Sequence, residues 1–114
     1  MKKYRVLIVA EDSIFSNSIE LLLVLQENLE IVGTVADDIQ VIAFEIEHTR
    51  PDVVIINSEI ATAHTDLVMT LLKTYTNLRV ITVRLDDNRI NVYGNREVPV
   101  TTIDDLVSAI TENK

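Results

Sequence analysis

The 114-residue chain carries 18 acidic and 10 basic residues, for a formal net charge of −8, and contains no cysteine. This length and an apolar content of 47% suffice for one globular domain, 1–114, with its own core. The acidic balance argues against nucleic acid as a partner, because phosphate contacts need clustered Lys and Arg. Disulfides and cysteine chemistry are excluded, and the longest apolar run, 21–25, is too short to span a bilayer. We therefore expect a cytoplasmic protein without a membrane partner.

Strand and helix patterns alternate along the first 85 residues. Apolar, β-branched runs predict strands at 5–10, 30–36, 52–56 and 78–85. Periodic apolar residues predict helices from Ser13 to about Leu29, over 38–49 behind an Asp37 cap, and from Thr62 or Thr65 to about Tyr75. Alternation of this kind is typical of right-handed crossovers in a parallel, doubly wound α/β sheet.

The alternation breaks after residue 85. Only the four residues 86–89 precede the strand-like run 90–93, whereas a parallel crossover needs a dozen or more. The chain must turn back as an antiparallel β-hairpin where a fourth helix would otherwise lie. Val98-Pro99-Val100 then predicts a short edge strand, because proline cannot donate to the ladder. Thr101 or Thr102 is expected to cap a last helix that runs through Ile110.

Polar residues follow two of the predicted strands, as Glu11-Asp12 after the first and Asn57-Ser58-Glu59 after the third. The carboxyl ends of parallel strands meet at one sheet edge, where carboxylates could hold magnesium. With these residues in place, the chain resembles a response-regulator receiver domain of two-component signalling. The segments that carry the resemblance are Val6-Leu7-Ile8-Val9, Pro51-Asp52-Val53-Val54 and the last helix, 104–110. The resemblance implies a flavodoxin-like fold in which the hairpin replaces the fourth helix.

Receivers bind magnesium through an acidic pair and accept a phosphoryl group on an aspartate, which a Ser or Thr and a lysine then contact. By resemblance, these positions hold Ala10 and Glu11 for the acidic pair, Asn57 for the aspartate, Arg84 for the hydroxyl and Val98 for the lysine. An amide carries no charge and is a poor nucleophile, so Asn57 cannot form an acyl phosphate. We therefore predict a degenerate phosphoacceptor site without catalytic residues, metal or cofactor.

Two features of this site stay open from sequence alone. Glu11, Asp12 and Glu59 are either remnants at a solvated strand end or ligands of a weak metal site. Arg84 either pairs with Glu11 in place of a cation or is an ordinary surface arginine. His48 and His64 are expected to face solvent, without a nucleophile beside them.

The helix faces suggest an interaction surface. At 100° per residue, the first helix is expected to bury Ile14, Ser18, Leu22, Leu25 and Leu29, and the second Ile39, Ile42, Ala43 and Ile46. The apolar residues then left outside are Leu23 and Val24 in the first helix and Val41 and Phe44 in the second. They form one patch if both helices flank the same sheet face, and Leu23→Glu or Phe44→Glu is then expected to abolish association with the fold intact. Ile90 and Val92 are expected to lie on an exposed ribbon whose edge can pair with another chain.

The function predicted from these observations is that of a non-phosphorylatable pseudo-receiver. It would act as a signalling or regulatory protein–protein interaction module, by homodimerisation or by docking to a protein partner, and would not be an enzyme. One alternative is a sensor that binds a small anion in the strand-end cavity near Glu11, Asn57 and Arg84. Another is an atypical response regulator that still uses the site as a switch.

Overall fold

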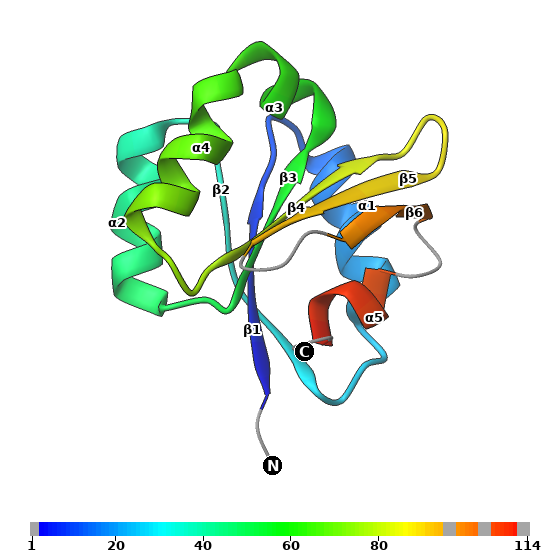
Figure 1. Ribbon diagram of the computed structural model, residues 1–114. Coiled ribbons are helices and arrows are strands. Elements are labelled where there is room, and N and C mark those ends of the chain that lie inside the picture. Colours follow the sequence, from blue (N-terminus) through cyan, green and yellow to red (C-terminus); the bar gives the residue numbers. More distant parts are fainter. Residues whose placement is uncertain (1–2, 95–97, 103–105, 112–114) are drawn as a thin grey trace.

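A single sheet organises the protein, whose computed structural model describes residues 3–94, 98–102 and 106–111 (Figure 1). Its described strands have the order β2-β1-β3-β4-β5-β6. They are β1 (Tyr4–Val9), β2 (Leu29–Val35), β3 (Val53–Asn57), β4 (Arg79–Arg84), β5 (Arg89–Tyr93) and β6 (Val98–Thr102). Strands β1 to β4 are parallel, β5 runs antiparallel to β4, and β6 runs antiparallel to β5. The first five strands follow the order 2-1-3-4-5, so the predicted flavodoxin-like α/β fold is confirmed.

The predicted hairpin is also confirmed. A turn at residues 85–88 joins β4 to β5, with no helix between them. Asn88 has a φ of 60°, a left-handed conformation that asparagine tolerates better than most residues. Strand β6 lies at the edge of the sheet, as its proline predicted.

The helices differ from the sequence prediction mainly at their ends. They are α1 (Ser13–Leu23), α2 (Ile39–Thr49), α3 (Ser58–Ala63), α4 (Thr65–Thr74) and α5 (Leu106–Thr111). The first helix ends six residues earlier than predicted, and Leu29 begins β2 instead. Asp38, rather than Asp37, caps α2 by accepting hydrogen bonds from the Gln40 and Val41 amides. Thr101 and Thr102 belong to β6, and the segment that would contain the start of the last helix, 103–105, lies outside the described residues. None of the helices in the described ranges is long and apolar enough to cross a membrane.

Helices cover the two faces of the sheet in separate layers (Figure 1). On one face, α1 and α5 pack against alternate strand residues such as Val6 and Ile8. On the other, α2, α3 and α4 pack against Leu7 and Val9. Because side chains alternate across a strand, burial of both faces explains why β1 reads as a continuous apolar run.

The orientation of α1 is the main error of the sequence prediction. Its buried side is formed by Phe15, Ile19 and Leu23, and Leu23 is only 2% exposed. Ile14 and Leu25, predicted to be buried, are 75% and 86% exposed. The helix is apolar on both sides, so its periodicity fits two opposite orientations. Counting Leu29 as part of the helix favoured the wrong one.

The predicted merged patch does not exist. Val41 and Phe44 are exposed on α2 and Val24 is exposed on α1, as predicted, but the two helices lie on opposite faces of the sheet. In α2, Ile42 and Ile46 are buried as expected, whereas Ile39 is exposed. Leu23 belongs to the core, so it cannot be part of an interaction surface.

The predicted exposed ribbon is wrong as well. Ile90 and Val92 are buried in the core layer of α1 and α5. Their neighbours Arg89 and Tyr93 are exposed. The alternation along β5 was read correctly, but its apolar side faces a helical layer and not solvent.

Candidate functional site

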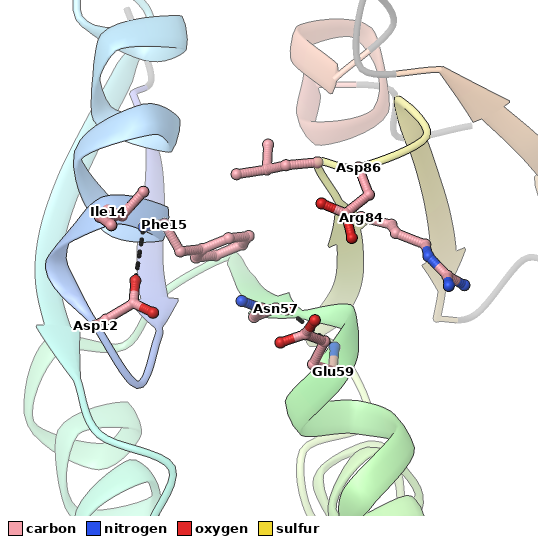
Figure 2. Close-up of a pocket in the computed structure, with 8 residues that line it drawn as sticks. Asp12, Ile14, Phe15, Asn57, Glu59, Arg84 and Asp86 are labelled. Carbon is pink, nitrogen blue, oxygen red and sulfur yellow. Dashed lines mark hydrogen bonds between the residues drawn. The ribbon is translucent and has the colours of Figure 1, made fainter.

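A hollow of about 150 Å³ lies where the carboxyl ends of β3 and β4 face the start of α1 (Figure 2). Its walls are formed by Asp12, Ile14, Phe15, Asn57, Glu59, Arg84, Leu85 and Asp86. The sequence predicted that Asn57 and Arg84 would meet here, and the fold brings both to this wall. Ala10 and Glu11 do not line it, and the Ala10 amide donates a hydrogen bond to the Val35 carbonyl on β2 at 3.0 Å.

Asn57 ends β3 and at the same time caps α3. Its backbone is extended, with φ −57° and ψ 131°, and its Oδ1 accepts a hydrogen bond from the Glu59 amide at 2.9 Å (Figure 2). The first amides of a helix lack partners within the helix, and an Asn or Asp side chain supplies one. Sequence reasoning missed this role because it placed the helix start at Thr62 or Thr65. The signal was present as an asparagine directly after an apolar strand.

Asp12 caps the start of α1 in the same way. Its Oδ1 accepts a hydrogen bond from the Phe15 amide at 3.0 Å. An anionic cap at a helix N-terminus also interacts favourably with the helix dipole. The side chains of Asn57 and Asp12, which both line the hollow, therefore act as helix caps.

Arg84 does not act as a substitute cation in the hollow. Its guanidinium points away from Asn57 (Figure 2), and its Nε lies 3.7 Å from Asp87 Oδ2. The Arg89 Nε approaches the same carboxylate oxygen at 3.9 Å. These side chains are largely exposed, so such pairs contribute little to stability. Of the two alternatives, the surface arginine fits the structure, and pairing with Glu11 is not observed.

Val98 lies away from the hollow. In the sheet register it pairs with Val92, which pairs with Ile81 on β4, whereas Asn57 is level with Val83. Strand β6 is also separated from β3 by two intervening strands. The hairpin causes this displacement, because β5 takes the position next to β4. The predicted correspondence of Val98 to a phosphate-binding lysine is therefore not supported.

The charge around the hollow is predominantly negative. Asp12, Glu59 and Asp86 contribute three carboxylates, against the single guanidinium of Arg84. Over the part of the chain that the structure describes, no cluster of three His, Asp or Glu side chains is arranged to hold a metal ion. The arrangement thus offers helix caps and negative charge, and neither a carboxylate at position 57 nor a cation cage.

Two further hollows lie elsewhere. One, of about 520 Å³, lies between the start of α2 and α4, where His64 Nε2 is 3.7 Å from Asp37 Oδ2. The other, of about 630 Å³, lies between the ends of α2 and α4, where the Tyr75 hydroxyl donates a 3.4 Å hydrogen bond to Glu47. Burial raises the pKa of Tyr75, and the charge and hydrogen bond of Glu47 raise it further.

Both histidines, His48 and His64, are exposed, as predicted. The ring of His48 stacks on that of Phe44, with the ring centroids 5.8 Å apart.

Comparison of the sequence with protein-family models and with curated proteins gave no match. What the structure establishes about the class of this protein is its flavodoxin-like α/β fold.

Proposed function

We propose that this protein is a non-phosphorylatable pseudo-receiver, a cytoplasmic regulatory module that works by binding another protein and not by catalysis. The observation that carries the proposal is Asn57, which stands at the end of β3 and uses its amide oxygen to cap α3. The flavodoxin-like strand order supports the receiver resemblance but does not by itself imply a function. The proposal therefore depends on the chemistry of the hollow.

Phosphoryl acceptance needs a nucleophile and positive charge to offset the phosphate. Asn57 supplies no anionic oxygen, and the neighbouring groups of Asp12, Glu59 and Asp86 are carboxylates. A phosphoryl group placed among them would be repelled, since like charges at a few ångströms interact unfavourably in a partly desolvated site. The same excess of carboxylates disfavours the alternative in which the hollow senses a small anion, and the Arg84 guanidinium points away from Asn57 (Figure 2).

Intact-mass spectrometry after incubation with magnesium and acetyl phosphate tests the proposal. The wild-type mass should not change at any donor concentration, while a functional receiver domain treated in parallel gains a phosphoryl group. Asn57→Asp is the informative variant, because aspartate keeps the α3 cap and restores the carboxylate. A phosphoryl group on the wild-type protein that maps to the hollow would contradict the proposal and favour the atypical switch.

A further inference from the structure

The outward side of α1 and the turn that follows it carry an apolar ridge, which we define as Ile14, Leu21, Val24 and Leu25. Leu21 is 76% exposed and Val24 is 67% exposed, in addition to the exposed Ile14 and Leu25. At 100° per residue, Ile14 and Leu21 fall within about 20° of each other on α1, opposite the buried side, and Val24 and Leu25 follow in the turn after the helix. The helical part of the ridge, from Ile14 to Leu21, is about 10 Å long, or two helical turns. Ile14 also borders the strand-end hollow together with Leu85, which extends the apolar surface in that direction.

Ser18 interrupts the ridge without making it polar. Its hydroxyl donates a 2.8 Å hydrogen bond to the Ile14 carbonyl, so its donor is already used. A partner packed over this position would not leave the hydroxyl proton without an acceptor. The surface between Ile14 and Leu21 is therefore suited to dry contact.

The charged residues of the segment that carries the ridge are all acidic. From Glu11 to Glu27 there is no Lys or Arg, and the acids are Glu11, Asp12, Glu20 and Glu27. Glu11 and Glu27, close in sequence to the two ends of the ridge, are exposed, and Glu20 is half-buried beside it. Arg84 lines the hollow with Ile14, but the carboxylate of Asp86 lines it too, and Asp87 lies 3.7 Å from the Arg84 Nε. An apolar surface in such surroundings favours a partner that combines apolar and basic side chains.

From this juxtaposition we propose that the ridge docks a cationic amphipathic helix of a partner protein, an inference that rests on the proposed interaction function and adds the face and the chemistry. A helix satisfies its own backbone and meets α1 through side chains at i, i+3, i+4 and i+7. An extended segment would leave backbone groups without partners on this surface, because α1 offers no free strand edge.

The negative charge of the protein also disfavours two other occupants of the ridge, a second copy of this chain and anionic lipid. Two copies of this chain joined through the ridge would bring two wholly acidic stretches together, each within a molecule of net charge −8. Anionic lipid would be repelled for the same reason. A basic helix gains attraction at long range and apolar burial at contact.

Fluorescence anisotropy of a labelled leucine–lysine peptide tests the docking site. The peptide, about five turns long, carries leucine on one helical face and lysine on the other. Binding to the wild-type protein should weaken as salt is raised. Leu21→Gln combined with Leu25→Gln should weaken it by at least about tenfold, since central apolar anchors carry most of an interface's affinity. Glutamine is nearly as good a helix former as leucine, so α1 should persist.

Phe44→Gln is the matched control, because Phe44 is an apolar residue on the other sheet face that is also mostly exposed, at 68%. It should bind the peptide as the wild type does, and a leucine–glutamate peptide should not bind. Equal affinity of the ridge variant and the wild type, or equal loss in Phe44→Gln, would overturn the proposal. So would a concentration-dependent dimer that the ridge variant abolishes, since the occupant would then be a second copy. None of these binding results supports or contradicts the proposed lack of phosphorylation, which the mass measurement tests independently.

Discussion

The two opposite sides of α1 differ in burial, and this difference predicts different stability losses for the same substitution on each side. Leu23 is 2% exposed and packs in the core layer with Phe15 and Ile19, whereas Leu21, two residues away, is 76% exposed. Leu→Ala at a buried site costs about 2–5 kcal/mol through lost transfer energy and the residual cavity. The same substitution at an exposed site changes stability by no more than about 0.5 kcal/mol. Because both positions lie in the same helix, the effect of helix propensity cancels in the comparison.

Urea unfolding followed by circular dichroism measures the difference. With a loss of about 3 kcal/mol and an m-value of about 1.5 kcal/mol/M, Leu23→Ala should lower the unfolding midpoint by about 2 M. Leu21→Ala should move it by less than about 0.4 M. Equal midpoints, or a larger loss for Leu21→Ala, would show that α1 packs through its other side. Leu23→Glu should destabilise the protein further, because it buries a carboxylate without a partner.

Further predictions concern the caps and the Tyr75 hydroxyl. Asn57→Ala should cost about 1 kcal/mol of unfolding free energy by removing the α3 cap, while Asn57→Asp stays within a few tenths, and equal loss in both variants would contradict the capping role. Asp12→Ala should cost a similar 0.5–2 kcal/mol, roughly, at the start of α1, measured in the same urea series. The pKa of Tyr75 lies above its ordinary value of 10.0, mainly through burial and then through Glu47. The folded state thus holds the Tyr75 proton more tightly than the unfolded state does. The contribution of Tyr75 to the free energy of unfolding is therefore complete below pH 10 and is lost as pH rises through the folded-state pKa. Ultraviolet titration should show that Glu47→Gln lowers the pKa of Tyr75 and that Tyr75→Phe reduces the alkaline loss of stability. If the pKa of Tyr75 is the same in Glu47→Gln as in the wild type, Glu47 does not contribute to raising it.

The strands were predictable because their signals are local and unambiguous. The four residues Val6 to Val9 of β1 are all apolar, which is typical of a strand covered on both faces. The hairpin followed from the length of the connection between β4 and β5 alone, since four residues cannot make a parallel crossover. Sequence reasoning therefore predicted the direction of these strands and the sheet edge where Asn57 lies, whereas the resemblance to receiver domains implied their order in the sheet.

The orientation of α1 and the details of the site depend on tertiary packing that one sequence does not contain. Leu21 and Leu23 are identical in type, and only the position of the sheet decides which of them is buried. Arg84 was expected either to pair with Glu11 or to be a surface arginine, and its pairing with Asp87 depends on the tight turn at 85–88. Val98 was placed by resemblance to a strand that the hairpin had moved outward in the sheet. In each case the missing information was a long-range contact.

A nuclear magnetic resonance titration of the isotope-labelled protein tests the central claim most directly, with the Asn57 side-chain amide as the reporter. We predict that magnesium and acetyl phosphate leave the Asn57 amide resonances and the backbone signals of β3 and α3 unchanged. A saturable shift of the Asn57 side-chain amide, accompanied by a phosphoryl group in the hollow, would contradict the account.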